Sequence, residues 1–163
     1  LPTIFETFRA YNVKALFFVS TELLKDHPRL IKEILERGHE VGSHGHFHIR
    51  YRDSWRASQD AEMSNAIISS VLGHSNIHYR APWFHRITSD PYSNPRNHMS
   101  LLKIMHLGLK PKQNTIFYLH PFDIVKGSQS PNVFCSIWYR NPEKACKLFK
   151  SLVSKFTGEV RLR

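Results

Sequence analysis

The feature that most constrains the fold of this chain is an uninterrupted apolar run, Ala15 to Val19. The run lies in a segment of strand length, residues 14–20, and its side chains do not alternate between polar and apolar. A strand without such alternation is typical of a parallel sheet that is covered by helices on both faces. We therefore expect residues 14–20 to form a strand that is buried on both sides.

Helical and strand-like segments alternate along the rest of the chain. Asn12 ends the first predicted helix, and Pro28 and Gly38 bracket the second, because proline suits a first turn and glycine follows a last one. The predicted helices are 1–11, 28–37, 54–72 and 143–156, the predicted strands are 14–20, 39–43, 77–80, 115–120 and 159–162, and 90–97 is the clearest loop. This alternation favours an α/β fold with a parallel sheet, most simply a barrel, in a single domain over residues 1–163.

The formal net charge is +10, from 23 Lys and Arg against 13 Asp and Glu. Such a charge attracts polyanions, whether an acidic polysaccharide, a membrane surface or nucleic acid. The basic residues are scattered through predicted helices, which favours solvated helix faces, and we expect no nucleic-acid partner. No apolar stretch approaches the roughly eighteen residues of a membrane span, so we expect no transmembrane segment.

A histidine-rich segment, Gly38 to His48, follows the second predicted strand. If the chain makes one helical turn after Ser43, His44 and His48 project from the same side and can reach one metal ion. His46 is a poor third ligand by its spacing. The H-x-x-x-H pattern is also common in surface loops, so the pattern alone leaves both readings open.

Two further predicted strands end in chemically active residues. Arg80, Pro82 and Trp83 follow the third strand, and Leu119 and His120 close the fourth. Active sites of α/β barrels lie at the carboxyl ends of the strands, where these residues would meet the histidines. Without that context, Trp83 could be a core or rim aromatic and Arg80 a structural ion pair.

Taken in order, these segments resemble the polysaccharide deacetylases of carbohydrate esterase family 4, also called the NodB-homology domain. Residues 11–19 resemble the strand after the first helix of the family, 38–48 its metal motif, 79–83 its R-x-P-[YW] motif and 117–121 its L-x-H motif. The resemblance covers residues 1–121, and 140–163 resemble the closing helix and strand of the family.

The resemblance implies a deformed (β/α) barrel that hydrolyses N-acetyl or O-acetyl groups of a polysaccharide or oligosaccharide. It implies that His44 and His48, with one aspartate, hold Zn²⁺ or another divalent ion such as Co²⁺, which activates water and polarises the acetyl oxygen.

By the same resemblance, four further residues have roles around the metal. The backbone N–H of Trp83 would stabilise the oxyanion, and Arg80 would hold the catalytic base through a charge-assisted hydrogen bond. His120 would be the general acid that protonates the leaving amine, and Leu119 would line the pocket for the acetyl methyl group.

The chain also departs from the family pattern. The acidic pair that supplies the base and the third metal ligand would, by its usual spacing, fall before Leu1, so we expect a partial domain that lacks its first strand. Gly45 replaces a serine or threonine of many members and removes a hydroxyl that steadies the metal loop. Asp90, the only acidic residue between Trp83 and Thr115, does not match the fourth motif of the family.

These departures leave an alternative to the deacetylase hypothesis. A catalytically inactive barrel could bind a carbohydrate through Trp83, neighbouring aromatic residues and its basic surface. A non-catalytic phosphate-binding or regulatory protein is supported by charge alone.

Overall fold

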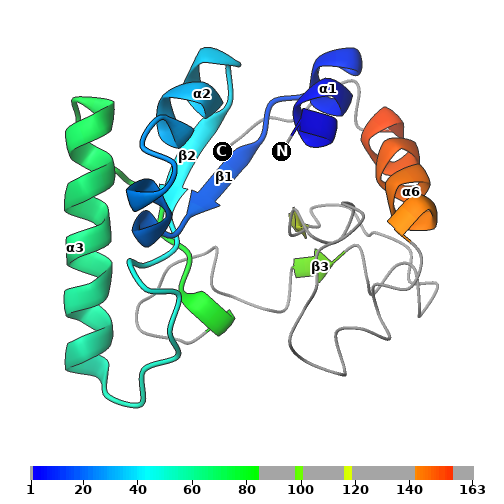
Figure 1. The fold of residues 1–163 in the computed structure, drawn as a ribbon. Helices are drawn as coiled ribbons and strands as arrows, with labels where there is room; N and C mark the ends of the chain where they lie inside the picture. The colour runs from blue at the N-terminus through cyan, green and yellow to red at the C-terminus, as the bar shows by residue number, and fades with distance from the viewer. Residues whose placement is uncertain (1, 85–97, 101–115, 119–141, 156–163) are drawn as a thin grey trace. The chain divides into compact units, whose positions relative to one another are not determined.

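The structure is a computed structural model that describes residues 2–84, 98–100, 116–118 and 142–155 (Figure 1). The chain divides into two compact units, one formed by residues 14–95 and the other by residues 1–13 together with 96–163. The predicted loop 90–97 and the predicted strand 159–162 lie outside the described residues. The single-domain prediction therefore stays a prediction.

The sheet of the first unit contains two parallel strands, β1 (Leu16–Val19) and β2 (Glu40–Ser43). Both were expected at these places, and Figure 1 shows them as adjacent arrows. The predicted strand 77–80 is reduced to one parallel bridge, between Ser43 and Tyr79. The bridge places the residues after 79 beside the carboxyl end of β2.

Residues 77–80 lie so close to β2 that β2 needs a glycine where they meet. A Cβ atom on Gly42 would lie 2.8 Å from the Cβ atom of His78 and 2.8 Å from the Phe18 ring. No larger residue fits between these neighbours without a shift of the backbone.

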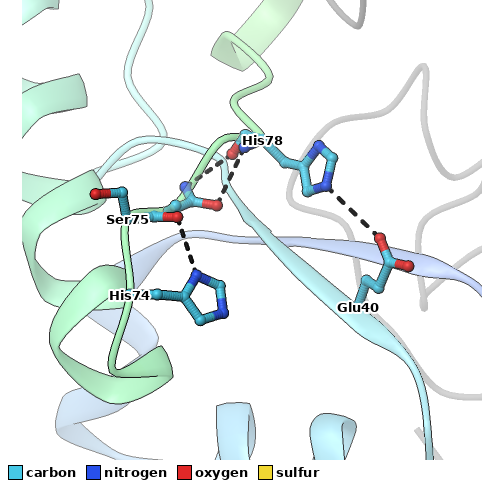
Figure 2. Close-up of polar contacts among 5 residues, drawn as sticks. Glu40, His74, Ser75 and His78 are labelled. Carbon is cyan, nitrogen blue, oxygen red and sulfur yellow. Dashed lines mark hydrogen bonds and ion pairs between the residues drawn. The ribbon is translucent and has the colours of Figure 1, made fainter. Parts of the chain in front are cut away.

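Side-chain contacts also hold the third segment against β2. Figure 2 shows the imidazole of His78 facing the carboxylate of Glu40, with 3.6 Å between His78 Nε2 and Glu40 Oε2. Asn76 donates to the His78 carbonyl at 2.9 Å and accepts from the His78 amide at 3.2 Å. His74, whose Nδ1 donates to the Ser75 carbonyl in the same figure, is exposed.

Burial within the sheet differs from the prediction. Leu16 to Phe18 are half-buried and only Val19 of β1 is buried, whereas Val41 to Ser43 of β2 are all buried. The reason is position: β2 lies between β1 and the Tyr79 segment, while β1 has β2 as its one strand neighbour among the described elements. The most apolar run is therefore not the most buried strand.

Three helical elements surround these strands: the 3₁₀ helix η1 (Thr21–Lys25), α2 (Leu30–Glu36) and α3 (Ser54–Leu72). Helix α2 begins two residues after Pro28, which lies in the preceding turn. It ends at Glu36, and Gly38, which was expected to close it, follows two residues later with a φ of 78° that permits the backbone bond from the His39 amide to the Ile34 carbonyl.

Helix α3 has the bounds that were predicted for it. The Asp53 carboxylate accepts bonds from the amides of Trp55 and Arg56 and so caps the first turn. Gly73, with φ 75°, ends the last turn in the left-handed conformation.

The second unit contains α1 (Pro2–Ala10), α6 (Pro142–Lys155) and a parallel pair of short strands, β3 (His98–Ser100) and β4 (Ile116–Tyr118). The rings of Phe8 and Phe149 pack edge to face with centroids 5.6 Å apart, which joins the two helices. Helix α1 ends at Ala10, and Asn12, which was predicted to stop it, follows in a left-handed conformation with φ 50°. Within the described ranges no helix has the length and apolar character needed to cross a membrane.

Candidate active site

The rings of His44 and His48 come together just beyond the end of β2. Their centroids lie 4.8 Å apart, with the ring planes at 60°. The expected helical turn is not formed: the chain bends through left-handed conformations at Gly45 (φ 77°) and His48 (φ 52°). Residues 44–48, here called the histidine loop, therefore bring the two imidazoles together by a different backbone path from the one expected.

A backbone carbonyl sets the orientation of His44. Its Nδ1 lies 2.7 Å from the carbonyl oxygen of Arg80, an acceptor that requires Nδ1 to carry the proton. The lone pair is then on Nε2, the arrangement usual for histidines that bind metal ions. The Arg80 carbonyl reaches this position because the preceding residue, Tyr79, forms a parallel bridge with Ser43 of β2.

Arg80 and Trp83 lie in the same neighbourhood. The guanidinium carbon of Arg80 is 5.9 Å from the centre of the Phe18 ring, and the Phe18 ring is 6.5 Å from that of His44. Trp83 is 65% exposed, and its ring lies 5.9 Å from the ring of His48. Its φ of 58° is rare for a bulky side chain, and such backbone conformations concentrate at functional sites.

The end of β1 and helix η1 hold one side of the histidine loop. The His44 amide donates to the Val19 carbonyl at 3.0 Å, and the amides of Thr21 and Glu22 each donate to a loop carbonyl at 3.1 Å. The Thr21 hydroxyl lies 2.8 Å from Nδ1 of His46, a ring that is 6% exposed. His46 is thus fixed inside the fold, in keeping with its poor spacing as a ligand.

Asp60 of α3 holds the other side of the loop. Its Oδ2 accepts from the His46 amide at 2.8 Å, and its Oδ1 accepts from the Phe47 amide at 3.2 Å and from the Tyr51 hydroxyl at 3.0 Å. Burial and the neighbouring carboxylate raise the pKa of Tyr51, which keeps its hydroxyl protonated as a donor. The side chain of Asp60 is therefore buried and accepts three hydrogen bonds.

Sequence reasoning missed Asp60. The signal was present, because Asp60 shares one face of the predicted helix 54–72 with Ala57, Ser64 and Ile68, all buried in the structure. A carboxylate on the buried face of a helix needs hydrogen-bond donors. Here the donors include amides of the histidine loop, which comes next to Asp60 only when the chain folds.

The two histidines fit a metal ion as imidazole ligands, a type that zinc and cobalt accept. Among the residues that the structure describes, no group of three histidine, cysteine or acidic side chains could hold an ion. Leu119, His120 and Asp90 lie outside the described residues, so their predicted positions stay predictions.

Comparison with known proteins identifies the family of the chain. Residues 1–87 match the polysaccharide deacetylase family. A stretch of 47 residues, 29% of this chain, is 45% identical to peptidoglycan-N-acetylglucosamine deacetylase PgdA of Listeria monocytogenes and covers 10% of that protein. A stretch of 95 residues, 55% of this chain, is 28% identical to the peptidoglycan deacetylase of Helicobacter pylori and covers 32% of it. The chain thus spans a third or less of the length of these relatives.

Two solved structures resemble most of the chain. Peptidoglycan deacetylase PdaC of Bacillus subtilis has a TM-score of 0.60 at 16% identity, over 94% of this chain and 76% of that one. A family 4 acetyl xylan esterase of Clostridium thermocellum, solved with a cobalt ion, has a TM-score of 0.58 at 18% identity, over 95% and 78%. At these identities the likeness shows the fold. The family match covers 87 of the 163 residues, among them β1, β2, the histidine loop and Trp83, and the chain belongs to the polysaccharide deacetylase family.

Proposed function

We propose that this protein is a metal-dependent hydrolase that removes N-acetyl or O-acetyl groups from an acetylated polysaccharide or oligosaccharide. The observation that carries the proposal is the pairing of His44 with His48 at the carboxyl end of β2, inside the stretch that matches the family. The fold we propose is the deformed (β/α) barrel of the family.

His44 and His48 would hold the ion, Zn²⁺ or another divalent metal such as Co²⁺. When bound, such an ion supplies Lewis acidity and a water nucleophile near neutral pH. The Arg80 carbonyl supports this role, because it holds His44 with the lone pair on Nε2. Catalytic zinc sites use three protein ligands, and we expect the third to be a carboxylate of the acidic pair of the family.

The remaining roles follow the order of the motifs. We propose that the backbone N–H of Trp83 binds the developing oxyanion and that Arg80 holds the carboxylate that acts as base. His120 would protonate the leaving amine, and Leu119 would contact the acetyl methyl group. The exposure of Trp83 beside His48 supports a place where a sugar can reach the histidines.

The substrate class that we propose is an acetylated glycan. Its support is that the matched relatives of Listeria and Helicobacter are peptidoglycan deacetylases. The net charge of +10 favours a glycan that carries anionic groups.

The test combines metal content with acetate release from an N-acetylglucosamine oligomer, using the protein as its gene encodes it. We expect His44→Ala and His48→Ala to lose both bound zinc and activity. His120→Ala should keep the zinc and lose roughly 10²- to 10⁴-fold in turnover, since it is proposed to transfer a proton. His74→Ala, which removes an exposed histidine outside the site, should change neither quantity.

Two results would contradict the proposal. If His120→Ala loses zinc in proportion, His120 is a ligand and its assigned role is wrong. If the protein binds zinc and the oligomer but releases no acetate from any N- or O-acetylated glycan tested, the deacetylase hypothesis fails and the carbohydrate-binding alternative is favoured.

A further inference from the structure

The histidine loop is held by a carboxylate that comes from a different element. Asp60 lies in the second turn of α3, is 7% exposed, and directs both of its oxygens at the loop. A buried carboxylate is costly unless donors surround it, so its place here is defined by the amides of His46 and Phe47. These two amides lie between the proposed metal ligands.

Because Asp60 accepts from two consecutive amides, it sets the orientation of the two middle peptide groups between His44 and His48. The ligand spacing of this loop does not come from a helical turn, which would satisfy such amides internally. It depends on bonds to a side chain outside the loop, and charge-assisted bonds of this kind are stronger than neutral ones.

The absence of a side chain at Gly45 allows Asp60 to approach the loop. A Cβ atom at Gly45 would lie 2.6 Å from Oδ2 of Asp60 and 3.2 Å from Cγ of Pro82, and the φ of 77° already disfavours other residues. The serine or threonine of many family members therefore cannot be accommodated beside Asp60 in this conformation. The loop is steadied here by the buried carboxylate rather than by a hydroxyl at position 45.

We infer that Asp60 is a positioning residue of the metal site, which holds the histidine loop so that His44 and His48 converge, and that Gly45 is required for its approach. The inference rests on the proposed function for the identity of the ligand, zinc. The geometry of the loop can be measured without any metal.

The first experiment compares Asp60→Ala with Ile68→Val in the same full-length protein. Ile68, two turns further along the buried face of α3, is 0% exposed and serves as a control for a modest loss of fold stability. We expect Asp60→Ala to weaken zinc binding by roughly 10- to 100-fold, the usual effect of removing a group that orients metal ligands. Ile68→Val should lower the melting temperature of the metal-free protein and leave zinc affinity unchanged.

The second readout uses metal-free protein. In Asp60→Ala the amides of His46 and Phe47 should lose protection against hydrogen exchange, and the nuclear Overhauser contact between the rings of His44 and His48 should weaken. The amide of His44, which donates to the Val19 carbonyl, should stay protected and serves as an internal control.

A double-mutant cycle tests the match between Gly45 and Asp60. Gly45→Ala should weaken zinc binding more in the wild-type background than in the Asp60→Ala background, because the contact at 2.6 Å is then absent while the strain at φ remains. Strictly additive losses would overturn this part of the inference.

Different results would contradict the proposed function and the positioning role of Asp60. If the wild-type protein binds no zinc, the proposed function fails, while the exchange and ring-contact data still decide whether Asp60 positions the loop. If the wild type binds zinc and Asp60→Ala binds it equally well with the ring contact intact, the positioning role is wrong.

Discussion

At the scale of single residues, the neighbours of each histidine ring determine its orientation and its burial. His44 is oriented by the Arg80 carbonyl, His46 by the Thr21 hydroxyl, and His78 faces Glu40. His39 is also buried, at 7% exposed, and its ring packs against the Phe17 ring at 5.3 Å between centroids. Its surroundings favour the neutral imidazole.

This environment predicts a loss of stability on the acid side. Burial, with a smaller contribution from the charge of Arg37, lowers the pKa of His39. Below the ordinary value of about 6.5 the unfolded chain binds a proton that the folded chain resists, so unfolding becomes easier as the pH falls through that range. Above it the contribution is fully present. His39→Gln should flatten the fall in melting temperature between about pH 7 and pH 5.

The matched control is His74→Gln, at an exposed histidine. Melting temperatures of the three proteins at several pH values measure the effect. An unchanged slope in His39→Gln would show that His39 does not cause the dependence.

At the scale of elements, α3 is the helix that holds the histidine loop, and residues at its own ends fix where it begins and stops. Its ends are set by Asp53 and Gly73, and its buried face presents Asp60 to the histidine loop. The Ser43 hydroxyl at the end of β2 also donates to Ser64 of this helix at 2.8 Å. The start and register of α3 therefore matter for the loop as well as for the core.

The N-terminal cap of α3 is testable. Asp53→Ala removes the acceptor for two first-turn amides, at 2.9 Å to Trp55 and 3.2 Å to Arg56. We expect a loss of about 0.5 to 2 kcal/mol in the free energy of unfolding, measured by urea denaturation. Glu62→Ala, exposed in the middle of the same helix, should cost less than about 0.5 kcal/mol. Equal losses in the two variants would show that the cap bonds contribute little.

At the scale of the whole molecule, the chain forms two compact units. Ile31, Ile34 and Ile68 are buried in the unit of residues 14–95, whereas Phe149 and Val153 are buried in the other. The family fold, shown by the likeness to PdaC over 94% of the chain, encompasses both units. The prediction of a single domain therefore implies that they unfold together.

Core substitutions, one in each unit, test this cooperativity. Ile34→Val removes one buried methyl-sized group at a cost of about 0.5 to 1.5 kcal/mol. Val153→Ala removes two buried methyl groups at a cost of roughly 1.5 kcal/mol or more. In a single domain each variant lowers one common melting transition, recorded by calorimetry. Two transitions, each shifted by only one of the variants, would show that the units fold independently.

Sequence reasoning succeeded where the cause is local. The ends of α1, α2 and α3 follow from Asn12, Gly38, Asp53 and Gly73, because caps and left-handed residues act within one turn of the chain. The parallel pairing of β1 with β2 and the family of the chain were also predicted. These features need no knowledge of what packs against them.

Tertiary structure decided the features whose partners are distant in sequence. The lone pair of His44 is set by a carbonyl 36 residues away, and the histidine loop is bent around a carboxylate 14 residues from His46. The buried strand is β2 rather than the more apolar β1, because burial depends on neighbours and not on composition. The sequence by itself determined that His44 and His48 follow β2 and that Arg80 and Trp83 follow the next strand-like segment. Only the packing of α3 and of residues 77–80 determined the geometry in which the two histidines converge, since hydrogen bonds between distant elements exist only in the folded chain.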